Sequence, residues 1–103
     1  MYKRQGPCIV TADEFDTYPP KMGIRSFVNG EKRQDSNTAL QIFDIDHVIA
    51  ELSQGMTLKA GTIIATGTPA GVGMGMDPPQ FLKPGDVVRC EIDGIGTLTN
   101  PVK

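Results

Sequence analysis

A glycine-rich segment at residues 67–73 has the residue types best suited to ligand binding, and it directly follows an apolar run. Glycines let a ligand approach the backbone closely and expose N–H groups to an anion. The hydroxyl of Thr68 could bond a carboxylate. A nucleotide phosphate loop is disfavoured, because no Lys-Ser/Thr pair follows and the glycine spacing is not GxGxxG. The residues alone leave open a ligand-binding loop or an ordinary wide turn.

Two acidic groups could be taken for metal ligands or catalytic acids. Glu91 and Asp93 lie two apart in a β-prone run, so they share one face, and Mg²⁺ prefers such oxygen ligands. They end a hairpin at an Asp-Gly turn, however, where acids usually face water, so we expect no metal there. Asp44, Asp46 and His47 stand at the start of a predicted helix, where acids cap the helix and complement its dipole. We expect an exposed His47 that is not a catalytic base.

Composition and charge narrow the class of protein. A chain of 103 residues suits one domain, and the ten basic and twelve acidic residues leave a formal charge of -2. That balance argues against a nucleic-acid-binding module. There is no long apolar run for a membrane span and no charged-then-apolar leader, so we expect a cytoplasmic protein. Cys8 and Cys90 lack CxxC spacing, which predicts reduced, buried thiols rather than a disulfide.

Turn residues divide the chain into short elements, since Gly (12) and Pro (8) make up about a fifth of it. Two Asn/Asp-Gly pairs, at Asn29-Gly30 and Asp93-Gly94, are typical of hairpin turns. The predicted hairpin strands are residues 24–28 with 32–36, and 86–92 with 95–99.

One helix is predicted after Asp44, because apolar residues follow at helical spacing and form one stripe. Its members are Ile45, Val48, Ile49 and Leu52. Gly55 is expected in the left-handed position that ends the helix. Two further β-prone runs, residues 8–11 and 62–66, are predicted as strands, the second one buried. These elements indicate a β-rich α+β domain with a glycine-rich loop.

Together these segments resemble the fumarylacetoacetate hydrolase family from about Gly6 to Val102. The resemblance rests on ordered motifs. They are Gly6-Pro7-x-Ile9-Val10-Thr11, Val28-Asn29-Gly30-Glu31, Arg33-Gln34-Asp35-Ser36-Asn37-Thr38, Ile42-Phe43, Leu52-Ser53-x-Gly55-Met56-Thr57-Leu58, Ala65-Thr66-Gly67-Thr68-Pro69-Ala70-Gly71-Val72-Gly73, Leu82-Lys83-Pro84-Gly85-Asp86-Val87-Val88 and Gly94-Ile95-Gly96-Thr97-Leu98-x-Asn100-Pro101-Val102. The nearest branch looks like the hydroxymuconate and heptadienedioate isomerases and the acylpyruvate hydrolases.

The resemblance implies a β-dominated mixed β-roll, commonly dimeric, in enzymes of aromatic catabolism that depend on Mg²⁺ or Mn²⁺. The metal would chelate a 2-oxo acid and stabilise the enolate formed by C–C hydrolysis, decarboxylation or isomerisation. In the family, a Glu-x-Glu pair, a later Asp and a Lys carry this chemistry, and all precede the Gly-Pro-x-Ile-Val-Thr motif. We therefore expect residues 6–103 to be an incomplete, C-terminal part of the catalytic domain. By itself it would be inactive, with no catalytic or metal-ligating residue of its own.

Carried over residue by residue, the resemblance leaves a substrate contact in the glycine-rich loop. Thr68 would bind the substrate carboxylate and Gly67 would allow a close backbone approach, with Asn37 and Thr38 near the site. Residues 1–5 resemble a translated transposon-end adapter, so we expect a non-native leader there, with a genuine basic start as the alternative. The competing function is a stand-alone, non-enzymatic β-domain that binds an acidic metabolite or a partner protein.

Overall fold

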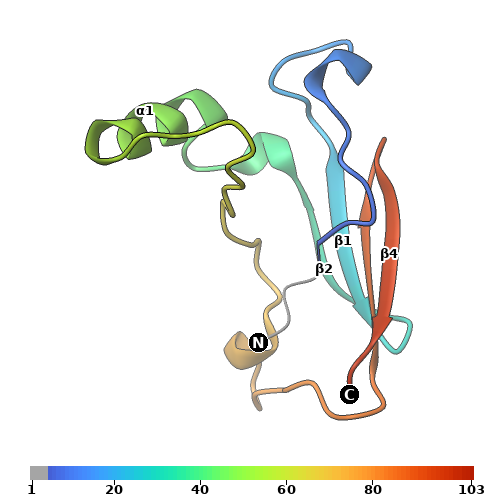
Figure 1. Ribbon diagram of the computed structural model, residues 1–103. Helices are drawn as coiled ribbons and strands as arrows, with labels where there is room; N and C mark the ends of the chain where they lie inside the picture. The colour runs from blue at the N-terminus through green and yellow to red at the C-terminus, as the bar shows by residue number, and fades with distance from the viewer. Residues whose placement is uncertain (1–4) are drawn as a thin grey trace.

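The computed structural model describes residues 5–103, so the leader expected at residues 1–5 lies almost wholly outside the described part of the chain. Four strands and one α-helix dominate (Figure 1). In chain order, the elements are η1 (Ala12–Glu14), β1 (Gly23–Val28), β2 (Glu31–Asn37), η2 (Thr38–Leu40), α1 (Ile45–Gly55), η3 (Gly73–Gly75), β3 (Val87–Ile92) and β4 (Gly96–Pro101). The predicted α+β class, with two hairpins and one main helix, is confirmed.

The strands form one antiparallel sheet in the order β2-β1-β3-β4. Asn29 and Gly30 link β1 to β2 with φ values of 52° and 85°. Positive φ at both central residues is the signature of a type I′ turn, whose twist matches that of the strands. The β1–β2 register shifts between Ser26 and Phe27, where β2 carries one extra residue. This bulge brings Ser26 opposite Gln34.

The second hairpin joins β3 to β4 through a three-residue turn, so β4 begins at Gly96 rather than at the predicted residue 95. Pairing of β1 with β3 unites the two hairpins. At one end of this pairing, Asn29 fixes the junction with its side chain: its Oδ1 accepts from the Val87 N–H at 2.8 Å. Its amide nitrogen donates to Asp86 at 2.8 Å. The first hairpin turn is thus hydrogen-bonded to the start of β3.

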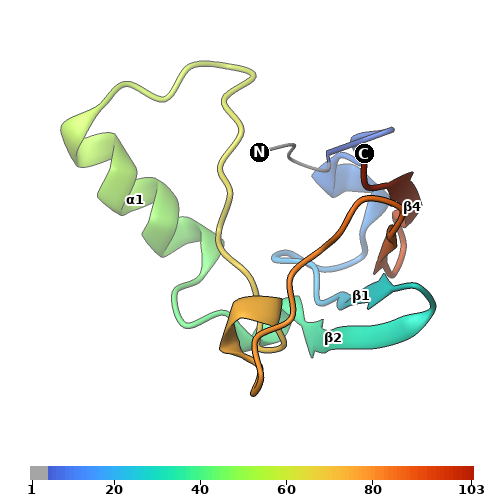
Figure 2. The same ribbon diagram turned by 90° about the horizontal axis from the view of Figure 1, so that it is seen from below.

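Helix α1 begins as predicted and lies apart from the sheet in both ribbon views (Figures 1 and 2). Asp44 is its N-cap, because its Oδ1 accepts from the His47 N–H at 2.7 Å. The prediction for Gly55 is wrong: it is the last helical residue, and Met56 follows at φ -152°, which is extended backbone. The apolar stripe has no buried member, and Ile49 is 42% exposed.

The structure also corrects the expectations for two β-prone segments and for the burial of the cysteines. Within the described residues 5–103, residues 8–11 and 62–66 have no strand partner, so neither segment forms a β-strand there. Ile9 and Ile63 are 85% and 69% exposed, so the second segment is not buried either. Both cysteines are free thiols as predicted, but Cys8 is exposed and Cys90 is only half-buried. A β-prone sequence forms a strand only when a neighbouring strand supplies hydrogen-bonding partners.

Much apolar surface stays accessible in this chain. Val88 is the one buried apolar side chain among residues 5–103. The accessible surface is 8162 Å², whereas a compact protein of this mass exposes about 5,700 Å². The radius of gyration is 15.3 Å, against about 13 Å for a compact domain. The fold therefore exposes about 2,500 Å² beyond the compact expectation. Within residues 5–103, no helix has the length and apolar character needed to cross a bilayer.

Candidate functional site

The glycine-rich loop packs directly on strand β2, as Figure 2 shows for the segment around η3. Gly71 has a φ of +103°, and a Cβ built there would lie 2.0 Å from the carbonyl oxygen of Arg33 in β2. A Cβ on Gly73 would lie 1.8 Å from the carbonyl oxygen of Gln80, whose N–H donates to Gly73 at 2.8 Å. Only glycine fits either backbone approach, so Gly71 fixes how the loop lies on the sheet and Gly73 fixes how the Gln80 segment lies on the loop.

A chain of side-chain hydrogen bonds ties the same loop to the sheet. Ser26 Oγ in β1 donates to Gln34 Oε1 in β2 at 2.8 Å. Gln34 Nε2 then donates to Thr68 Oγ1 at 2.7 Å and to the carbonyl oxygen of Pro69 at 2.8 Å. Ser26 and Gln34 are half-buried, whereas Thr68 is exposed. The sheet therefore holds Thr68 in place while its hydroxyl stays accessible.

Gly67 differs from Gly71 in its surroundings. Its φ is +101°, but a Cβ built there would meet nothing within 4 Å. The space beside its backbone is therefore open, as a close ligand approach requires. Gly67 and Thr68 thus present one open backbone position and one accessible hydroxyl side by side at the start of the loop.

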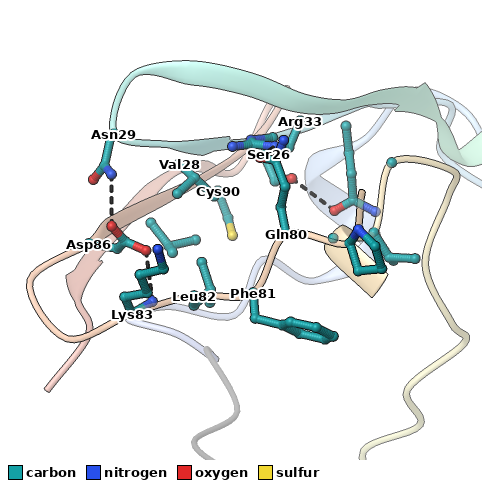
Figure 3. Close-up of a pocket in the computed structure, with 16 residues that line it drawn as sticks. Ser26, Val28, Asn29, Arg33, Gln80, Phe81, Leu82, Lys83, Asp86 and Cys90 are labelled. Carbon is teal, nitrogen blue, oxygen red and sulfur yellow. Dashed lines mark hydrogen bonds between the residues drawn. The ribbon is translucent and has the colours of Figure 1, made fainter. Parts of the chain in front are cut away.

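A groove of about 690 Å³ lies between the sheet and the segment that follows the loop (Figure 3). Val28 and Cys90 form part of its floor, and Leu82 lies across from them, while the Phe81 ring points away. Gln34 lines the groove and also holds Thr68, so it connects the two features. Apolar walls with a few polar groups are typical of small-molecule sites.

Two of the charged groups that line the groove, Arg33 and Asp86, are engaged by neighbouring residues. Arg33 pairs with Glu31 at 3.3 Å and donates to Gln80 Oε1. Asp86 accepts hydrogen bonds from the Lys83 N–H at 2.8 Å and from Asn29, and these bonds hold the pKa of its carboxyl below the ordinary value. The groove therefore presents amide and hydroxyl groups beside these two engaged charges and the Lys83 side chain.

Glu91 in β3 and Asp93 in the turn that follows both pair with arginines. Arg25 lies 3.6 Å from Glu91 and forms an ion pair with Asp93, which raises the pKa of the Arg25 guanidinium. Arg89 lies 3.2 Å from Glu91. In the part of the chain that the structure describes, no three His, Cys, Asp or Glu side chains gather where they could hold a metal ion.

The other polar residues singled out from the sequence serve local structure. Thr38 Oγ1 accepts from the Met22 N–H at 2.9 Å and donates to the Pro20 carbonyl at 2.8 Å, and Asn37 caps η2. Asp44 caps α1 as predicted, and His47 is exposed as predicted and stacks on Phe43 at 4.7 Å.

Ser26 and Gln34 were not singled out from the sequence as site residues. Gln34 stands within a resemblance motif, but a single-sequence pattern gives no sign of its contact with a loop 34 positions away. A regular two-residue hairpin would place Ser26 opposite Arg33, and the bulge moves it opposite Gln34. The pairing register was therefore the missing signal.

Comparison with known proteins identifies the family. Residues 2–103 match the family model described as fumarylacetoacetate (FAA) hydrolase C-terminal. An uncharacterized protein of Staphylococcus saprophyticus is 57% identical over 95 residues, which cover 92% of this chain and 31% of the relative. The chain thus spans about a third of the length of the curated relatives it matches.

Three solved structures share the fold. Fumarylacetoacetate hydrolase from Exiguobacterium antarcticum is 53% identical with a TM-score of 0.88, covering 95% of this chain and 35% of that one. A 5-carboxymethyl-2-hydroxymuconate delta-isomerase from Mycobacterium smegmatis is 45% identical (TM-score 0.77, 94% and 34%). Maleylpyruvate hydrolase from Sphingobium sp. SYK-6, in complex with manganese(II) ion and pyruvate, is 41% identical (TM-score 0.82, 94% and 34%).

Proposed function

The chain belongs to the fumarylacetoacetate hydrolase family, and we propose that residues 6–103 are the C-terminal part of a divalent-metal-dependent enzyme acting on 2-oxo acids or their enols. The reaction would be C–C bond hydrolysis, decarboxylation or isomerisation of acylpyruvate- or hydroxymuconate-type substrates. Support comes from structural neighbours that are hydrolases and isomerases. The neighbour that binds manganese and pyruvate supports a 2-oxo-acid substrate.

The observation that carries the proposal is the loop held by the sheet at Gly71 and Gln34. In this role, the exposed hydroxyl of Thr68 donates a hydrogen bond to the substrate carboxylate, and the open backbone at Gly67 lets that carboxylate come close. Both groups are in place before a substrate arrives, so little ordering is needed on binding. This part of the site binds and orients the acid end of the substrate.

The metal, Mg²⁺ or Mn²⁺, would be held by residues outside this stretch. The residues that the structure describes do not fit a metal site, because Glu91 and Asp93 are paired with Arg25 and no other acidic cluster forms among them. We therefore assign no metal step to this chain and expect residues 6–103 alone to be inactive. A cytoplasmic homodimer of the complete protein is part of the same proposal, and the open surface supports further association.

A chimera tests this function. Residues 6–103 replace the matching third of the Exiguobacterium antarcticum hydrolase, and hydrolysis of acylpyruvates is assayed in the presence of Mg²⁺ or Mn²⁺. We expect activity in the chimera and a rise in KM of about 10- to 100-fold on Thr68→Val, which deletes a hydrogen bond to a charged group. A folded chimera whose KM is indifferent to Thr68→Val contradicts the role of Thr68.

The stand-alone β-domain is tested on the 103-residue chain itself. It would require a soluble monomer that unfolds cooperatively without any further polypeptide. The large exposed surface of 8162 Å² favours the enzyme-fragment proposal instead, because such a surface promotes association. Analytical ultracentrifugation with urea denaturation separates the two.

A further inference from the structure

We propose that Gln34 is a positioning residue that sets the direction of the Thr68 hydroxyl proton, and so makes Thr68 a hydrogen-bond donor toward the ligand. This inference rests on the proposed function of the loop. It assigns a role to a side chain in β2 that lies 34 residues from Thr68 in sequence but 2.7 Å from its hydroxyl oxygen.

The orientation follows from what each atom can do. The carbonyl oxygen of Pro69 can only accept a hydrogen bond, so the group 2.8 Å from it must be the NH₂ end of the Gln34 amide. The same nitrogen lies 2.7 Å from Thr68 Oγ1 and, as an amide, can only donate. Thr68 Oγ1 is therefore the acceptor in this contact. Its own proton must point elsewhere.

Ser26 fixes the amide from the other side. With the nitrogen assigned, the remaining Gln34 atom is the carbonyl oxygen, which accepts from Ser26 Oγ at 2.8 Å. In a flipped amide, Gln34 Oε1 could no longer accept from Ser26 Oγ and would instead lie against the carbonyl oxygen of Pro69, where two acceptors repel. Both Nε2 protons and the Oε1 acceptor are thus used within the protein, and Ser26 and Gln34 are half-buried. The network has a single satisfied orientation.

The consequence is a chemical selectivity. With one lone pair of its oxygen accepting from Gln34, the exposed hydroxyl of Thr68 offers its proton to the outside. A ligand group with acceptor oxygens, such as a carboxylate, satisfies that proton, whereas a group that can only donate, such as an ammonium, leaves it without a partner. Gln34 would therefore favour a ligand that presents an acceptor oxygen to Thr68, although it does not touch the ligand itself.

Gln34→Glu is the discriminating substitution, because it is close to isosteric and removes the donor. A carboxylate at this position accepts the Thr68 proton, turning it inward. Its negative charge would also repel a substrate anion, so the substitution is combined with Thr68→Val in a double-mutant cycle. Gln41→Glu is the matched control, since Gln41 contacts Thr66 Oγ1 at 3.3 Å in a neighbouring, exposed pair.

The first test measures the affinity of the chimera described above for pyruvate, the probe anion, by calorimetry in the presence of Mn²⁺. We expect Gln34→Glu to weaken pyruvate binding about 10- to 100-fold, and Gln41→Glu to change it little. The loss from Gln34→Glu should be much smaller when it is made on top of Thr68→Val. An equal loss with and without Thr68→Val would make Gln34 a structural or purely electrostatic residue and overturn the inference. If Thr68→Val alone leaves pyruvate affinity unchanged, the proposed function of the loop fails instead.

The spectroscopic arm needs no ligand. Selective ¹⁵N-glutamine labelling of the 103-residue chain and of the chimera resolves the side-chain amides. We expect both Gln34 Nε2 protons to exchange more slowly than those of Gln41, and Thr68→Val to shift one of them while leaving the other, bonded to Pro69, in place. Gln34 protons that exchange as fast as those of Gln41 in both proteins would overturn the inference.

Discussion

Replacing Gly71 with Ala should detach the glycine-rich loop from strand β2. The added Cβ would lie 2.0 Å from the Arg33 carbonyl oxygen, closer than real Cβ contacts reach, so the loop must move by at least about 1 Å. That movement stretches the Gln34–Thr68 and Gln34–Pro69 hydrogen bonds, now 2.7 and 2.8 Å, beyond the usual range. Two lost hydrogen bonds and the strain of Ala at φ +103° together amount to about 2–4 kcal/mol of local stability.

Hydrogen exchange of the backbone amides in residues 68–80 measures this effect on the 103-residue chain. The Gln80 N–H, which donates to Gly73 at 2.8 Å, reports on the loop directly. We expect its exchange to accelerate by about 30- to 700-fold in Gly71→Ala.

Gly67→Ala supplies the matched control, because Gly67 has nearly the same φ, +101°, but no atom within 4 Å of a Cβ. Only backbone strain of about 1 kcal/mol applies there, so exchange should accelerate about fivefold. Equal effects of the two substitutions would refute the reasoning, because they would show that the contact with Arg33 does not hold the loop.

Three further predictions concern the sheet, the helix and metal binding. Asp86 has a lowered pKa in the folded chain, so its contribution to stability is present above its unfolded pKa near 4 and is lost as the pH falls through its folded value. In urea denaturation, the Asp86→Asn variant should therefore be less stable than the parent at pH 7, and this difference in stability should shrink below about pH 4. Asp44→Ala removes the N-cap bond to His47 and should cost helix α1 about 1 kcal/mol, read as lost ellipticity at 222 nm, whereas Ser53→Ala at the other end should cost less. The 103-residue chain should bind Mg²⁺ no more tightly than about millimolar in calorimetry, and a micromolar site would contradict the assignment of the metal ligands to other parts of the protein.

The elements that the sequence predicted well are those specified locally. Asn29-Gly30 determines a type I′ turn through residues that tolerate positive φ, and Asp44 caps α1 through a contact only three positions long. Residues 8–11 and 62–66 have β-branched character but no neighbouring strand in the described chain, so propensity alone misled. The prediction of a left-handed Gly55 was also wrong, because the chain leaves the helix through an extended residue, Met56.

The site was predictable only in part, because its supports are long-range. Gly67 and Thr68 stand out in one segment, and their roles as substrate contacts stay a prediction. Gln34 and Ser26 could not be found from spacing, since a regular hairpin would face Ser26 toward Arg33. No local sequence pattern predicts the extra residue in β2 that changes this pairing.

The exposed surface bears on the same site. Ile63 on the segment leading into the loop is 69% exposed, Ile49 of the helix stripe is 42% exposed, and the groove floor at Val28 and Cys90 is only half-buried. Burial of apolar surface is the main stabilising term in folding, so a surface about 2,500 Å² larger than expected leaves this stretch marginal alone. We therefore expect that any polypeptide covering this surface will stabilise the fold and, by the same contacts, complete the groove beside Thr68.

The bulge in the first hairpin links the fold to the proposed chemistry. One extra residue in β2 places Gln34, rather than Arg33, opposite Ser26, so that an amide and not a guanidinium meets Thr68. A guanidinium has no acceptor for the Ser26 proton, whereas the amide accepts from Ser26 and donates to Thr68 at once. The register of a strand pair thus decides the direction of a hydroxyl proton on a separate loop.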